Sequence, residues 1–180
     1  RNGRYVILSS NSKITTEIRL IDTDDVSAAP SVVLPREQGV EYSVAVGERG
    51  HILLTNNQGK TWVQKKSPTR RTLNSVYLID QKTIWIVGHQ STVLRSLDSG
   101  ESWTKIKVLD DPETSFLDLL FVDSRRGFIV GSYGKFFSTI DGGNTWIENK
   151  QEEDPHFYQI TSASNGLLWL IGEFGTVWKS

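Results

Sequence analysis

A repeat of about 42 residues is the feature that most constrains how this chain folds. Gly47, Gly88, Gly131 and Gly172 each open a similar segment, and they lie 41, 43 and 41 residues apart. Between these positions the sequence consists of short apolar runs separated by turn residues, which predicts strands and no helix. One small sheet cannot bury both of its faces, so each repeat must stack on its neighbours.

Each of the first three repeats continues into one turn motif, S/T-x-D-x-G-x-S/T-W, the Asp box. Its Asp (or Asn), Gly and Trp positions are filled by Asn57, Gly59 and Trp62, by Asp98, Gly100 and Trp103, and by Asp141, Gly143 and Trp146. A short carboxylate accepts hydrogen bonds from turn amides, glycine adopts a positive φ, and tryptophan packs between sheets. We therefore interpret these residues as structural and not as catalytic.

Two of the repeats divide into four strands each. The expected strands are residues 73–79, 83–88, 92–96 and 102–107 in one repeat, and 116–122, 127–131, 135–139 and 145–150 in the next. Four short antiparallel strands per repeat are typical of a propeller blade. The prediction is an all-β chain, a β-propeller of about 4–5 blades of four-stranded antiparallel sheets. It either closes by itself or is an open arc completed by self-association through its blade edges.

Composition and motifs exclude several classes of function. A formal net charge of -1 argues against a nucleic-acid partner, and no apolar run is long enough to span a membrane. The chain has no cysteine, and its three histidines lack the spacing of metal ligands. No G-x-S-x-G nucleophile motif occurs. We expect no enzyme activity, no cofactor and no metal.

Residues 44–180 resemble the BNR-type propellers of the photosystem II stability and assembly factor family. The repeat pattern V-G-x-x-G-x-(I/V/F)-x-x-S/T-x-D-x-G-x-T-W and residues 126–131 carry the resemblance. That family is lumenal and uses a basic propeller face, whereas the residues themselves assign no compartment. Loops at equivalent blade positions converge on one propeller face, which predicts a basic face formed by Arg49, Arg70, Arg71, Arg125 and Arg126. With the resemblance this gives one binding hypothesis, in which Arg49, Arg125 and Arg126 on that face bind an acidic or C-terminal peptide. Scattered solvated charge is the alternative.

The first 43 residues do not fit the repeat. Segments 4–10, 16–22 and 32–44 resemble the propeller of the prolyl oligopeptidase and oligopeptidase B family. This predicts an oligopeptidase-like segment at 1–43 and Asp-box blades at 44–180, together forming one propeller domain. The seam between the two resemblances lies near Tyr42. Together with the absence of methionine, it predicts an engineered hybrid, a non-catalytic scaffold without an evolved activity. The assembly-factor reading is the alternative. A third reading is a sialidase-like, glycan-active propeller, although the arginine cluster of those enzymes cannot be placed.

Overall fold

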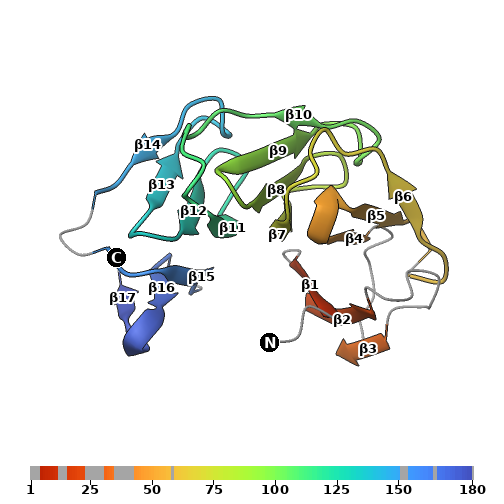
Figure 1. Cartoon of the computed structure of the whole chain (residues 1–180), viewed down its shortest axis with the longest axis horizontal. Coiled ribbons are helices and arrows are strands. Elements are labelled where there is room, and N and C mark those ends of the chain that lie inside the picture. Colours follow the sequence, from red (N-terminus) through yellow and green to blue (C-terminus); the bar gives the residue numbers. More distant parts are fainter. Residues whose placement is uncertain are drawn as a thin grey trace.

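The structure is a computed structural model, and it describes residues 5–11, 16–22, 31–34, 43–57, 59–150, 154–163 and 166–179. These residues form five antiparallel sheets, and each sheet consists of strands that are consecutive in the chain. Figure 1 shows the sheets following one another around an arc, with the first and the last sheet at its two ends. Together with propeller structures of similar fold, described below, this confirms the predicted all-β propeller.

The strands of each sheet have the following bounds. The first sheet contains β1 (Tyr5–Asn11), β2 (Thr16–Asp22) and β3 (Ser31–Leu34), and the second contains β4 (Ser43–Val46), β5 (Ile52–Thr55) and β6 (Val63–Lys65). The third contains β7 (Leu73–Leu78), β8 (Ile84–Gly88), β9 (Thr92–Ser96) and β10 (Thr104–Lys105). The fourth contains β11 (Phe116–Phe121), β12 (Gly127–Gly131), β13 (Phe136–Thr139) and β14 (Ile147–Glu148). The last contains β15 (Phe157–Ser162), β16 (Leu168–Gly172) and β17 (Val177–Lys179). Two single 3₁₀ turns, η1 (Glu48–Gly50) and η2 (Glu173–Gly175), join β4 to β5 and β16 to β17.

The core lies between the sheets, and β8 illustrates how one strand serves two interfaces. Ile84 and Ile86 pack into the cluster shared with the second sheet. Trp85 and Val87 point the other way, into the cluster shared with the fourth sheet. Because both faces are covered, the strand is a continuous apolar run and not an alternating one. Each such side chain contributes about 1.5–3 kcal/mol by burial.

The inner strands β7, β11 and β15 are tied together by one carboxylate. Each of these strands carries a register shift at the same repeat position, between Leu73 and Ser75, Phe116 and Asp118, and Phe157 and Gln159. Ser75 donates its hydroxyl to Asp118 Oδ1 at 2.7 Å, and the Ile160 amide donates to Asp118 Oδ2 at 3.0 Å. Asp118 thereby links three successive sheets.

The four strands predicted for each of the repeats at 73–107 and 116–150 are present in the third and fourth sheets. Two of the five sheets have four strands, while the other three have three in the described residues. The outermost strands are also shorter than expected, because residues assigned to them belong to the preceding turn. Ser102, for example, is bonded to Asp98, so that β10 begins only at Thr104. The predicted seam at Tyr42 lies outside the described residues, and the division at residues 43 and 44 stays a prediction.

Candidate functional site

The three Asp boxes form the same turn between the last two strands of a sheet. In one of them, Ser96 donates its hydroxyl to Asp98 Oδ1 at 2.8 Å, the Ser102 amide donates to the same oxygen at 2.9 Å, and the Gly100 amide donates to Ser96 Oγ at 2.8 Å. Asp141 makes the equivalent bonds with Thr139 and Thr145. Asn57 replaces the carboxylate without loss of the pattern, because its Oδ1 accepts from Thr55 and Thr61, both at 2.9 Å.

These hydrogen bonds hold the box carboxylates in the ionised form. The Ser102 hydroxyl and amide, with the Ser96 hydroxyl, lower the pKa of Asp98 to about 2. The Thr145 hydroxyl and amide lower the pKa of Asp141 in the same way. A general acid needs a pKa near or above the working pH. The box carboxylates therefore brace turns and are unsuited to donating a proton.

The glycine and the tryptophan of the second and third boxes rest on the preceding sheet. A Cβ at Gly143 would lie 2.4 Å from the Trp85 ring, and one at Gly100 would lie 2.8 Å from Leu54 Cδ1. Trp146 meets Trp85 edge to face, with 5.8 Å between ring centroids. Trp103 likewise packs against a cluster that includes residues of the second sheet, whereas Trp62 packs against Ala45 and Leu53 of its own sheet. The second and third boxes therefore act as clamps between neighbouring blades.

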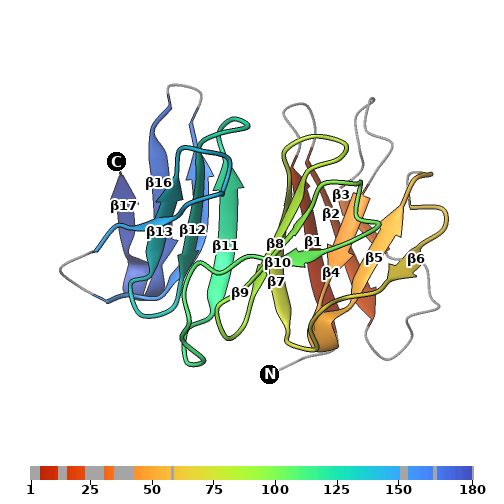
Figure 2. The same ribbon diagram turned by 90° about the horizontal axis from the view of Figure 1, so that it is seen from above.

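The three arginines predicted to share a face do not do so. Arg49 lies in η1, whose equivalents in later sheets join the second strand to the third. Arg125 and Arg126 lie between β11 and β12, the first and second strands of their sheet. Successive connections of an antiparallel sheet lie at opposite ends of its strands, and Figure 2 shows this separation. Arg125 and Arg126 lie at the Asp-box end of their sheet, because the amide of Gly142, in the third Asp box, donates to the Arg125 carbonyl at 2.8 Å.

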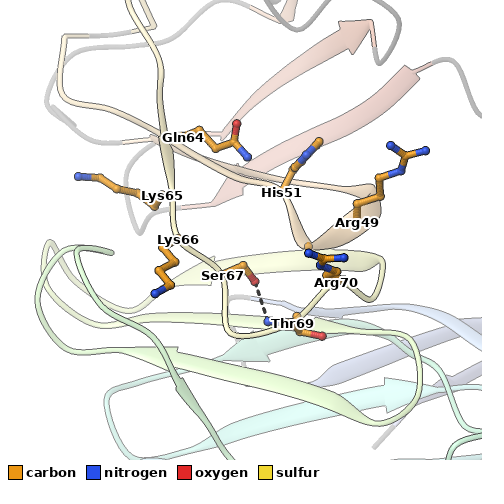
Figure 3. A pocket seen from close by; sticks show the side chains of 9 residues that line it. Arg49, His51, Gln64, Lys65, Lys66, Ser67, Thr69 and Arg70 are labelled. Atoms are coloured by element: carbon orange, nitrogen blue, oxygen red, sulfur yellow. Dashed lines mark hydrogen bonds between the residues drawn. The ribbon is translucent and has the colours of Figure 1, made fainter.

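Arg49 instead belongs to a basic groove at the opposite end from the boxes. The groove has a volume of about 610 Å³ and is lined by Arg49, Gly50, His51, Gln64, Lys65, Lys66, Ser67, Thr69 and Arg70. In Figure 3 the side chains of Arg49, His51 and Arg70 lie on one side, and those of Gln64, Lys65 and Lys66 on the other. We call this feature the basic groove.

Gly50 explains why Arg49 and Arg70, which are far apart in the sequence, both line the basic groove. Its φ is +72°, and a Cβ at this position would lie 2.1 Å from the Thr69 carbonyl oxygen. Only glycine lets the η1 turn press directly on the segment that precedes β7. This close approach brings Arg49 beside Arg70. Arg49 itself has a φ of 55°, an uncommon conformation for a long side chain that aims it away from the sheet.

The cations of the groove differ in how they are engaged. Lys65 donates to both oxygens of Glu101, at 2.7 and 2.8 Å, and is largely buried. Arg49, Lys66 and Arg70 are exposed and form no ion pair with a described acidic residue. Ser67 is committed to the loop, since its hydroxyl accepts from the Thr69 amide at 3.3 Å. The three exposed cations, Arg49, Lys66 and Arg70, are therefore available to bind an anion in the groove.

At the Asp-box end, by contrast, the charge of Arg126 is neutralised. Arg126 donates its Nε to Asp123 Oδ2 at 2.7 Å, and the amides of Arg125 and Arg126 donate to Asp123 Oδ1. The Arg126 amide and side chain, with the Arg125 amide, lower the pKa of Asp123 to about 2. Arg126 thus supports its own turn, whereas the side chain of Arg125 is exposed.

Sequence reasoning missed Lys66 as a site residue. The available signal was the density of basic residues from Lys65 to Arg71, but the repeat assigns those residues to an outer strand and a loop. Their approach to η1 depends on the contact between Gly50 and Thr69, which joins positions 19 residues apart.

The described residues also bear on metal binding and on membrane spanning. No group of three or more His, Cys, Asp or Glu side chains is arranged to hold a metal ion there. Within the same ranges, none of the helical segments has the length and apolar character needed to cross a membrane.

Solved structures with the same fold include both binding proteins and enzymes. A structure of YCF48 bound to D1 peptide aligns with 95% of this chain and 75% of its own length, with a TM-score of 0.56 at 18% identity. YCF48 from Cyanidioschyzon merolae gives a TM-score of 0.58 at 14% identity, covering 95% of this chain and 78% of its own. The GH74 enzyme of Niastella koreensis has a TM-score of 0.67 at 17% identity and covers 98% of this chain, which spans only 29% of the enzyme. At these identities the likeness shows the fold alone.

The family comparison is more specific than the structural one. The comparison with curated proteins gave no match. The family model described as photosynthesis system II assembly factor YCF48, however, matches twice, over residues 36–112 and 109–179. The first match begins before the predicted seam at Tyr42, inside the segment assigned to an oligopeptidase-like blade. Since the two matches together span most of the sequence, this chain belongs to the YCF48 family of photosystem II assembly factors.

Proposed function

We propose that this chain is a binding propeller whose basic groove captures a carboxylate-bearing segment of a partner protein. The observation that carries the proposal is that Arg49, Lys66 and Arg70 all line one groove and form no ion pair with a described acidic residue. Three cations along one groove repel one another, so a bound anion stabilises the arrangement. This is the assembly-factor hypothesis, but its binding surface is the basic groove and not the face formed by Arg49, Arg125 and Arg126.

Family membership supports a peptide as the anion. YCF48 itself has been solved with a D1 peptide bound. An extended chain segment fits a groove of this volume, and arginine forms paired hydrogen bonds with the two oxygens of a carboxylate. Whether the carboxylate is an acidic side chain or a chain terminus is decided by the experiment below.

A non-catalytic role agrees with the chemistry of the described residues. The described residues that line the basic groove include no carboxylate, whereas glycoside hydrolysis of the GH74 kind needs a pair of them flanking the scissile bond. The carboxylates of the Asp boxes have lowered pKa values and full hydrogen-bond shells. The hybrid-scaffold reading draws no support from the comparisons, and the oligopeptidase-like character of residues 1–43 stays a prediction.

The test is a binding titration with a matched arginine control. A short acidic peptide with a free C-terminal carboxylate is labelled, and its fluorescence anisotropy is measured with the wild-type chain, with Arg49→Gln/Arg70→Gln and with Arg125→Gln. Each lost charge-assisted bond is worth about 1.5–3 kcal/mol, so the double variant should bind at least about tenfold more weakly. Arg125→Gln should bind within about twofold of wild type, because its side chain lies at the other end of the strands.

Two further comparisons define the ligand and the failure of the proposal. Binding should weaken between about 50 and about 300 mM salt, as expected for exposed charges. An amidated peptide that binds as well as the free acid would assign recognition to acidic side chains, and a large loss would assign it to the terminus. The proposal is wrong if no peptide binds, or if Arg125→Gln weakens binding as much as the double variant.

A further inference from the structure

One turn recurs at the groove end of four successive sheets, and it holds one residue of each in the same uncommon backbone conformation. Arg49, Gln90, Tyr133 and Phe174 each stand two residues after a repeat glycine, with φ angles of 55°, 54°, 55° and 54°. Figure 2 shows these turns along one end of the strands. The left-handed conformation favours glycine and asparagine, and long side chains held in it gather at ligand-binding sites. The turn therefore presents a different side chain in each sheet on a constant backbone.

Tyr133 is an aromatic member of this series that lies at the junction of two sheets. It is 50% exposed, and its ring centroid lies 5.0 Å from that of His156. The Gly134 amide donates to the Pro155 carbonyl at 2.9 Å, so this turn rests on the segment that precedes β15, just as η1 rests on the segment that precedes β7. The groove end thus has a second contact of the same kind between sheets, with a half-exposed aromatic ring where the basic groove has an arginine.

The charge beside Tyr133 is opposite to that of the basic groove. Glu173 accepts a hydrogen bond from the His156 amide at 3.0 Å, so a carboxylate stands next to the two rings. A carboxylate of a ligand is repelled there, whereas an uncharged aromatic or aliphatic side chain packs well on an exposed ring. The two positions therefore select different groups, an anion at Arg49 and an apolar side chain at Tyr133.

Gln90 connects the two positions. It lies in the third sheet, between the sheets that carry Arg49 and Tyr133, and its side chain is exposed. Its carbonyl accepts a hydrogen bond from Arg71 Nη1 at 2.9 Å, which ties this turn to the segment that borders the basic groove. Arg49, Gln90 and Tyr133 thus form a row across three successive sheets, which we call the turn row.

We propose that the turn row reads the sequence of a peptide whose carboxylate lies in the basic groove, and that Tyr133 binds an aromatic or large aliphatic side chain of that peptide. This inference rests on the proposed function, because the groove supplies the anchor. Packed sheets lie about 10 Å apart, so two steps place Tyr133 about 20 Å from Arg49. An extended chain advances about 3.3 Å per residue, so the side chain that meets Tyr133 stands about six residues from the carboxylate.

The experiment places one phenylalanine at different distances from the anchoring carboxylate. The reference is a labelled serine peptide that ends in glutamate with a free C-terminus, so that both kinds of carboxylate stand at one end. Fluorescence anisotropy measures its affinity and that of derivatives with one phenylalanine. Phenylalanine about six residues before the glutamate should tighten binding at least about fivefold, and phenylalanine about two residues before it should tighten binding less than about twofold.

Matched variants show whether Tyr133 makes the contact. Tyr133→Asn removes the ring with a residue that tolerates positive φ. It should cancel the gain from phenylalanine and leave the affinity for the serine peptide within about twofold of wild type. Tyr133→Phe should keep the gain. Ile140→Asn is the control and should also keep it, because Ile140 is 67% exposed but lies in an Asp box, at the other end of the strands.

Three outcomes would overturn the inference. The first is no gain from phenylalanine at any spacing, and the second is a gain that survives Tyr133→Asn. The third is binding of a neutral glucan oligosaccharide that Tyr133→Asn abolishes, since the ring would then serve a sugar. The serine peptide separates the two proposals. If it binds through Arg49 and Arg70 while phenylalanine adds nothing, only this inference fails, and if it does not bind, the basic-groove proposal fails together with this inference.

Discussion

Replacing Gly143 by alanine isolates the contact on which blade stacking depends. Gly143 has a φ of +81°, and a Cβ there would lie 2.4 Å from two atoms of the buried Trp85 ring. The left-handed conformation costs a non-glycine residue about 1–2 kcal/mol. Forcing the ring to move adds about 1–3 kcal/mol of overpacking. We expect Gly143→Ala to lower the free energy of unfolding by about 2–5 kcal/mol, with a fall in Tm of about 2–4 °C for each kcal/mol.

Two glycines with similar backbone conformations serve as controls. Gly166 has a φ of +83° with no atom within 4 Å of its Cβ position, and Gly142 has a φ of +74° with one carbonyl at 3.1 Å. Alanine at either position should cost only the conformational term of about 1–2 kcal/mol. Urea denaturation followed by circular dichroism measures all three variants, with the slope checked for constant cooperativity.

A double variant identifies the clashing partner. In a Trp85→Leu background the space above the ring position is larger, so Gly143→Ala should cost no more than Gly166→Ala does. The reasoning is refuted if Gly143→Ala and Gly166→Ala differ by less than about 0.5 kcal/mol in the wild-type background, which is the usual error of additivity. It is also refuted if Trp85→Leu leaves the difference unchanged.

Three other predictions concern two aspartates, Asp98 in an Asp box and Asp118 in β11. Asp98→Ala leaves the Ser96 and Ser102 donors without their acceptor and should lower stability by about 1–2 kcal/mol, whereas Asp98→Asn should cost less than half as much because Asn57 fills the same role; thermal unfolding compares them, and equal losses would contradict the turn analysis. The folded-state pKa of Asp98 is lowered to about 2, so its ionised carboxylate stabilises the fold above the ordinary pKa, and this stabilisation is lost as the pH falls towards 2. The difference in Tm between wild type and Asp98→Asn should therefore shrink or change sign on acidification. Burial raises the pKa of Asp118, so its contribution to stability falls as the pH rises from its ordinary pKa to the raised one, and Asp118→Asn should flatten that slope in urea titrations at about pH 4 and about pH 7; an unchanged slope would show that Asp118 is not its source.

Much of the fold was predictable because the repeat carries its own structural chemistry. The spacing of glycine, Asp or Asn, and tryptophan in the box fixes a turn, and the apolar runs beside it fix strands buried on both faces. The bounds of the outer strands were less predictable. Residues such as Ser102 are polar, strand-like in pattern and yet bound to Asp98, so the pattern extends the outer strand into the turn.

The basic site was predictable only in part. Arg49 was recognised, but its grouping with Arg125 and Arg126 was wrong, because these residues do not share a repeat position. Arg49 follows Gly47, between β4 and β5, which are the counterparts of β12 and β13, whereas Arg125 and Arg126 lie one connection earlier, between β11 and β12. The pairing of Arg49 with Arg70 depends on the tight approach of Gly50 to Thr69, a packing contact that no local pattern encodes.

The position of a bound peptide tests the basic-groove proposal most directly. Hydrogen exchange of the full chain, with and without a saturating acidic peptide, compares the two ends of the propeller in one measurement. The account predicts slower exchange at residues 47–51 and 64–71, around the basic groove, and no change at residues 122–126. Slower exchange at residues 122–126 alone, or at neither end while the peptide is bound, would contradict it.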